Sequence, residues 1–117
     1  VINRFKSLFP ELAEPLERIT DRLYDLYPIT KKYYYHPDMH GSWSIKAVLP
    51  TVAPDLNYEA LDLVNNGALA EPAFLEMINK ETGSCRRDEL REALLRYCKL
   101  DTLAMVRLAH FLEGREA

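Results

Sequence analysis

The side chains with the clearest capacity for chemistry are Tyr97 and Asp101, four residues apart in the last part of the sequence. The last 30 or so residues predict one long helix, because apolar side chains recur there at steps of three and four. Asp101 falls inside this apolar stripe, one turn from Tyr97 on the same face. The stripe consists of Leu90, Leu94, Tyr97, Asp101, Ala104, Leu108 and Phe111. A buried carboxylate needs a hydrogen bond, a cation or a metal ion, so Asp101 must have a partner.

Two structural interpretations of Asp101 stay open beside a catalytic one. Aspartate is a favoured N-cap, so Asp101 can begin a new helix after a break at Leu100. It can also pair with an arginine from elsewhere in the chain. A neighbouring stripe is largely apolar as well, which predicts a wide buried face on this helix. That second stripe consists of Leu95, Cys98, Thr102, Met105, Ala109 and Leu112.

The elements that position these residues are mostly helical, with at most one or two short strands. Residues 1–9 predict a helix, and a second helix is expected from Pro10 to about Tyr27, where Pro28 ends it. The run of tyrosines at 33–35 favours extended structure. Further helices are expected over 45–49, stopped by Pro50, and over 68–80.

Two strings in this sequence resemble known families. The string YCKLDTLAMV (residues 97–106) resembles the third motif of the DEDDy 3′–5′ exonucleases, which have an RNase H-like α/β fold. The string YYHPDMHGSWSIKAVLP (residues 34–50) resembles the signature of a bacterial family called domain of unknown function 2779, and this resemblance runs from about Phe5 to Leu112.

The resemblance implies a metal-dependent 3′–5′ exonuclease acting on DNA or RNA. Enzymes of this type hold two divalent ions, Mg²⁺ or Mn²⁺, between acidic residues. Asp101 would then be a catalytic metal ligand, and Tyr97 would be the catalytic residue that orients the attacking water. The alternative is a catalytically silent module that binds nucleic acid or protein within a larger polypeptide.

The first motif of these enzymes, Asp-x-Glu, occurs nowhere in the chain. The sequence also starts at Val1, without Met, in what already reads as a helix. We therefore interpret residues 1–117 as a single unit that is the helical C-terminal portion of a larger nuclease-like domain beginning upstream of Val1. We expect this portion alone to bind no metal tightly, to be inactive, and to self-associate through exposed apolar surface.

Candidate substrate-binding residues lie in the second string. Ser44 and Lys46 begin the predicted helix at 45–49, and a helix N-terminus with a hydroxyl and a lysine suits a phosphate. Ordinary capping by Ser42 or Ser44 is the structural alternative. His36 joins this candidate set, and it also alternates with Asp38 and His40 in a pattern that can hold zinc.

A cluster of basic and aromatic residues lies just before this string. Lys31 and Lys32 precede three consecutive tyrosines, an arrangement that can stack on a single strand. The tyrosines can equally pack on the core. The net charge of −3 creates no general attraction to nucleic acid, so any contact must be local. With two cysteines, no signal peptide and no long apolar run, we expect a cytoplasmic protein without membrane contact.

Overall fold

The computed structural model describes residues 1–115, which form helices and turns and contain no strand. The mostly α prediction is therefore confirmed for this part of the chain. Three single-turn 3-10 helices cover Pro10–Leu12, Pro37–Met39 and Tyr58–Ala60. The α-helices are α1 (Ile2–Leu8), α2 (Ala13–Thr20), α3 (Leu26–Tyr33), α4 (Ile45–Val52), α5 (Gly67–Ile78) and α6 (Ser84–Leu112).

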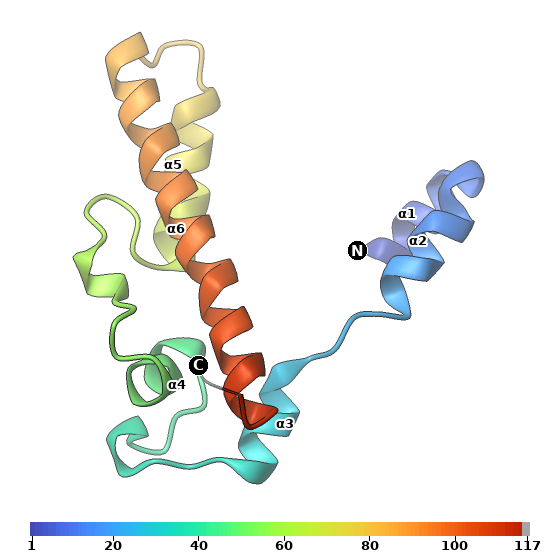
Figure 1. Cartoon of the computed structure of the whole chain (residues 1–117). Coiled ribbons are helices and arrows are strands. Elements are labelled where there is room, and N and C mark those ends of the chain that lie inside the picture. The colour runs from blue at the N-terminus through green and yellow to red at the C-terminus, as the bar shows by residue number, and fades with distance from the viewer. Residues whose placement is uncertain (116–117) are drawn as a thin grey trace.

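The long helix α6 organises most of the molecule. Its first half packs beside α5, and its second half packs on α4 and α3 (Figure 1). Three residues of its predicted stripe are buried: Leu90, Ala104 and Leu108. Leu90 packs with Val64 and Ala73, whereas Ala104 packs with the cluster that contains Leu49 and Tyr58. One helical face thus collects the apolar side chains of all the elements between 39 and 73.

The second apolar stripe of α6 does not behave as predicted. Leu95 and Met105 are about half exposed, and Cys98 and Thr102 are also exposed. The reason is that α5, α4 and α3 all pack on the side of α6 that carries Leu90, Ala104 and Leu108. The wide buried face expected from the sequence is narrower in the structure, and apolar surface remains uncovered.

Helices α1 and α2 pack on each other as a hairpin and stand apart from the other helices (Figure 1). The sequence predicted one helix from Pro10 to about Tyr27, and this prediction is wrong. Helix α2 ends at Thr20, and α3 begins at Leu26 because the Asp25 carboxylate accepts the Tyr27 N–H at 2.9 Å. Pro28 then lies in the first turn of α3, where its missing N–H costs little.

Proline also fails to stop α4, which continues past Pro50 to Val52. Val48, Leu49 and Val52 are all buried, so packing across both turns offsets the lost backbone hydrogen bond.

The tyrosine run is split: Tyr33 ends α3, and Tyr34 is extended. Among residues 1–115, no helix is long and apolar enough to cross a membrane.

Candidate functional site

Asp101 accepts a short hydrogen bond from the hydroxyl of Tyr58, with 2.6 Å between the oxygens. Helix α6 runs unbroken through Asp101, so the interpretation of this residue as an N-cap is wrong. Within residues 1–115 Asp101 forms no salt bridge, so the predicted arginine partner is absent there too. Tyr58 is only 7% exposed and lies in the 3-10 helix at Tyr58–Ala60, which Asn57 caps by accepting the Glu59 N–H.

Tyr97 lies beside this pair. Its ring centroid is 6.2 Å from that of Tyr58, with the rings tilted by 54°. Its hydroxyl approaches the start of α5, where a Cβ placed on Gly67 would lie 3.7 Å from the Tyr97 oxygen. The structure thus brings together Tyr97 and Asp101, as the sequence predicted, and adds Tyr58 between them.

The environment raises the pKa of both hydroxyls, so they stay protonated well above neutral pH. Burial, followed by the hydrogen bond to Asp101, raises the pKa of Tyr58 well above its ordinary value of 10.0. Burial and the charge of Asp101 also raise the pKa of Tyr97. Both groups are therefore proton donors and hydrogen-bond partners at neutral pH, and neither is suited to act as a base.

Lys46 is the one candidate substrate-binding residue that reaches this site. Its ammonium group lies 5.7 Å from the centroid of the Tyr58 ring, within the range of a cation–π contact. A cavity of about 500 Å³ opens here, and Lys46, Asn57, Tyr58 and Asn65 contribute to its lining. Glu59 also lines the cavity, which thus offers one positive charge, one carboxylate and two amides next to the Tyr58–Asp101 pair.

Ser44 and His36 have local roles instead. Ser44 is the N-cap residue of α4, but its side chain makes no capping bond and accepts from the Ser42 hydroxyl at 3.3 Å. His36 Nδ1 accepts the Asp38 N–H at 3.2 Å and so caps the 3-10 helix at Pro37–Met39. None of these hydrogen bonds joins either residue to Asp101.

The described residues do not fit a two-metal centre by themselves. In residues 1–115 no three His, Cys, Asp or Glu side chains gather closely enough to hold a metal ion. One oxygen of Asp101 is already taken by Tyr58. A two-metal site needs several carboxylates around the ions, and residues 1–115 form no such cluster.

A second group of functional interest surrounds Lys31. Its ammonium group lies 5.9 Å from the Tyr27 ring centroid and 5.7 Å from that of Trp43. The Tyr35 ring lies 5.7 Å from Trp43 at a tilt of 47°. We call these four side chains, Tyr27, Lys31, Tyr35 and Trp43, the Tyr–Lys surface.

The Tyr–Lys surface is exposed but firmly anchored. Tyr35 is 55% exposed and Tyr27 is half exposed, so these rings do not pack in the core. Trp43 donates its indole N–H to the Tyr34 carbonyl at 2.9 Å, and the Tyr34 ring packs edge-on against Phe111. Tyr34 therefore points inward while its neighbours point outward. Of the two interpretations of the tyrosine run, core packing holds for Tyr34 alone.

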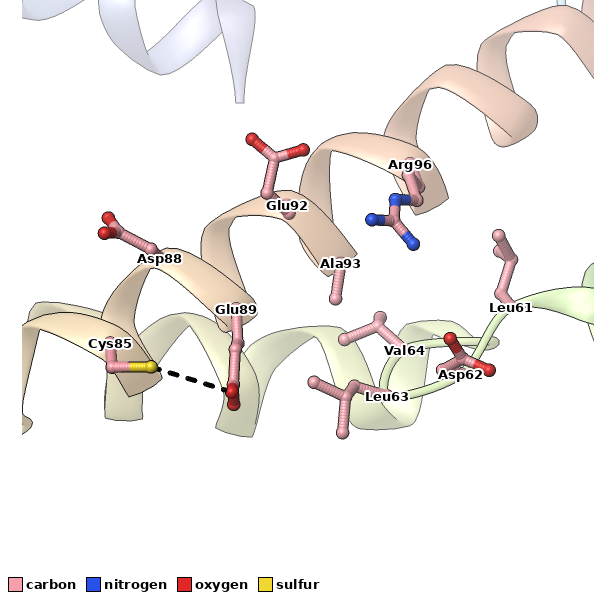
Figure 2. A pocket seen from close by; sticks show the side chains of 10 residues that line it. All are labelled: Leu61, Asp62, Leu63, Val64, Cys85, Asp88, Glu89, Glu92, Ala93 and Arg96. Atoms are coloured by element: carbon pink, nitrogen blue, oxygen red, sulfur yellow. Dashed lines mark hydrogen bonds between the residues drawn. The ribbon is translucent and has the colours of Figure 1, made fainter.

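A further cavity, of about 440 Å³, lies between α6 and the loop at 61–64 (Figure 2). Asp62, Asp88, Glu89 and Glu92 make its lining acidic, although Arg96 also contributes. Figure 2 shows Glu89 extending to the Cys85 thiol, with 3.9 Å between sulfur and oxygen. The acidic lining of this cavity repels phosphate.

Comparison with known families adds one match. The model of a family described as a domain of unknown function (DUF2779) matches residues 1–44. The match includes the Tyr–Lys surface and the first part of the string at 34–50, but neither Tyr97 nor Asp101. No curated protein and no solved structure matches the chain. The placement of residues 1–117 in a larger nuclease-like domain stays a prediction.

Tyr58 is the site residue that the sequence reasoning missed. It sits in a loop-like stretch with no helical period to assign it to a face. The available signal was Asn57, because an asparagine can cap a short turn by accepting the N–H two residues later, here that of Glu59. Such a cap fixes the direction of the residue between them.

Proposed function

We propose that this chain is a nucleic-acid-binding module that engages single strands through the Tyr–Lys surface. The observation that carries the proposal is the chain of contacts Tyr27–Lys31–Trp43–Tyr35 on the outside of the molecule. Exposed aromatic rings offer platforms for bases, and a lysine between them neutralises phosphate. Rings held at fixed positions lose little entropy when a base stacks on them.

Local charge supports this proposal despite the acidic chain as a whole. Residues 25–46 carry Lys31, Lys32 and Lys46 against the carboxylates of Asp25 and Asp38. Lys32 contacts the exposed Tyr33 ring at 5.0 Å, which extends the basic and aromatic character along α3. A single strand lying on α3 would thus meet positive charge and aromatic rings together.

Binding is tested with a fluorescein-labelled oligonucleotide, in a DNA arm and an RNA arm, by anisotropy. Tyr35→Ala is expected to weaken binding by about 1–3 kcal/mol, or roughly 5- to 150-fold in Kd, because one stacking platform is lost. Lys31→Gln is expected to weaken binding and to flatten its salt dependence. The matched controls are Tyr24→Ala, an exposed tyrosine outside the surface, and Lys99→Gln on α6. Equal losses in the controls and in Tyr35→Ala would reject this surface as the binding site.

Metal-dependent hydrolysis of nucleic acid is a second candidate function. The observation that favours it is the alignment of Tyr97 and Asp101, one turn apart on an unbroken helix and both half-buried. Because no cluster of three or more His, Cys, Asp or Glu side chains forms within residues 1–115, the remaining ligands would have to come from another polypeptide segment. In that arrangement Asp101 would serve as one ligand, and Tyr97 as a hydrogen-bond donor beside it.

This second candidate predicts no hydrolysis by the 117-residue chain alone. An end-labelled single strand incubated with the purified chain and Mn²⁺ or Mg²⁺ is expected to stay intact, since one carboxylate cannot hold two ions. Mn²⁺-dependent shortening of the strand, absent with Asp101→Ala, would contradict this expectation. Asp88→Ala, in the acidic cavity away from Tyr97, is the matched control.

A further inference from the structure

The chain is more extended than a compact monomer of its size. Its accessible surface is 8687 Å², whereas a compact monomer of this mass exposes about 6,600 Å². Its radius of gyration is 17.5 Å, against about 13 Å for a compact domain of this length. The excess surface of about 2,000 Å² exceeds the roughly 800 Å² that each partner buries in a standard interface.

Part of this surface is the apolar face of the α1–α2 hairpin. Phe5, Leu8, Phe9, Leu12 and Ile19 are all large, apolar and exposed, with Leu8 at 59%. Val1, Arg4, Phe5 and Leu8 also line a hollow of about 300 Å³ that is suited to receive apolar side chains. The packing of α1 on α2 leaves this apolar face of the hairpin uncovered.

A second uncovered apolar face runs along α6. It consists of Leu95, Cys98, Thr102, Met105 and Val106, which we call the α6 stripe. Met105 is 47% exposed, and it is flexible enough to fill an irregular hollow.

We propose that two copies of this chain exchange their hairpins, so that the α1–α2 hairpin of each copy covers the α6 stripe of the other. The hairpin is joined to α3 only by residues 21–25, outside regular helix, which leaves it accessible to a second molecule (Figure 1). A closed two-fold exchange covers both apolar faces of both copies at once. The apolar hollow beside Phe5 and Leu8 then receives side chains of the α6 stripe, which favours the pairing of unlike faces.

Sedimentation equilibrium of the whole chain from micromolar to submillimolar concentration tests the exchange. The expected mass is twice 13.6 kDa. Leu8→Lys on the hairpin and Met105→Lys on the stripe should each weaken the dimer at least about 10-fold, because each places a charge in an apolar contact. Asn3→Lys, an exposed position of α1 on the side away from Phe5, should leave the dimer intact. Leu8 and Met105 are both exposed, so circular dichroism should show unchanged helix content in both variants.

Mixing the two variants distinguishes exchange from other pairings. A mixed dimer keeps one intact contact, between the hairpin of the Met105→Lys copy and the stripe of the Leu8→Lys copy. An equimolar mixture should therefore dimerise more tightly than either variant alone. If the mixture dimerises no more tightly than either variant alone, hairpin does not pair with stripe, and the exchange is overturned. A wild-type chain that stays monomeric at every concentration would overturn it as well, whether compact or extended in solution.

Discussion

Leu108→Ala is expected to lower the free energy of unfolding by about 2–5 kcal/mol. Leu108 is 4% exposed and packs with Met39, Val48 and Val52, so it joins α6 to α4 and to the 3-10 helix at Pro37–Met39. Its removal leaves a cavity where three segments meet. Because small domains are stable by only about 5–15 kcal/mol, this loss is a large share of the total.

Urea unfolding followed by circular dichroism measures this effect. Leu75→Ala is the matched control, because Leu75 is an exposed leucine in the interior of α5 and its truncation should cost under about 1 kcal/mol. Similar midpoints for Leu108→Ala and Leu75→Ala would contradict the core described above. The same core holds Tyr34 against Phe111, so Leu108→Ala should also loosen the anchor of Trp43.

Tyr58→Phe is expected to lower the free energy of unfolding by about 1.5–3 kcal/mol, the usual worth of a hydrogen bond to a charged group. The phenylalanine ring keeps the packing but leaves the half-buried Asp101 carboxylate without its donor. Tyr97→Phe is the control: within residues 1–115 its hydroxyl makes no hydrogen bond, so its loss should cost less. Tyr58→Phe combined with Asp101→Leu should cost less than the sum of the two single changes.

The pH dependence of stability provides a second check on the same bond. The pKa of Tyr58 is higher in the folded chain than its ordinary value of 10.0. At a pH between these two values, the hydroxyl keeps its proton in the folded state and loses it in the unfolded state. The contribution of Tyr58 is therefore complete below pH 10 and is lost progressively as the pH rises further. Wild-type stability should fall above pH 10 more steeply than that of Tyr58→Phe. Parallel curves would contradict the Tyr58–Asp101 bond.

Helices with a regular apolar period could be predicted from the sequence, and those governed by capping could not. The stripe through Leu90 and Leu108 indicated α6 correctly, because packing on one face dictates the period. The division between α2 and α3 depends on the Asp25 cap, which a continuous leucine period conceals. Pro50 stays inside α4 because tertiary packing of Val52 outweighs the local cost of proline.

The candidate site could be predicted only in part, for a similar reason. Tyr97 and Asp101 share a helix, so their spacing alone placed them together. Tyr58 reaches Asp101 across 43 positions of sequence, and contacts of this kind depend on how separate elements pack. The burial of the second α6 stripe was predicted wrongly, because a helix shows its apolar residues but not how many neighbours cover them.

Trp43 offers the most direct test of binding by the Tyr–Lys surface. It is the only tryptophan in the chain, so tryptophan fluorescence reports on this surface alone. Titration with an unlabelled single-stranded oligonucleotide is predicted to quench this fluorescence until it saturates. The quenching should be smaller at high salt, and it should be weak in Tyr35→Ala. Oligonucleotide binding seen by anisotropy with no change in Trp43 fluorescence, or the absence of any binding, would contradict the proposed function.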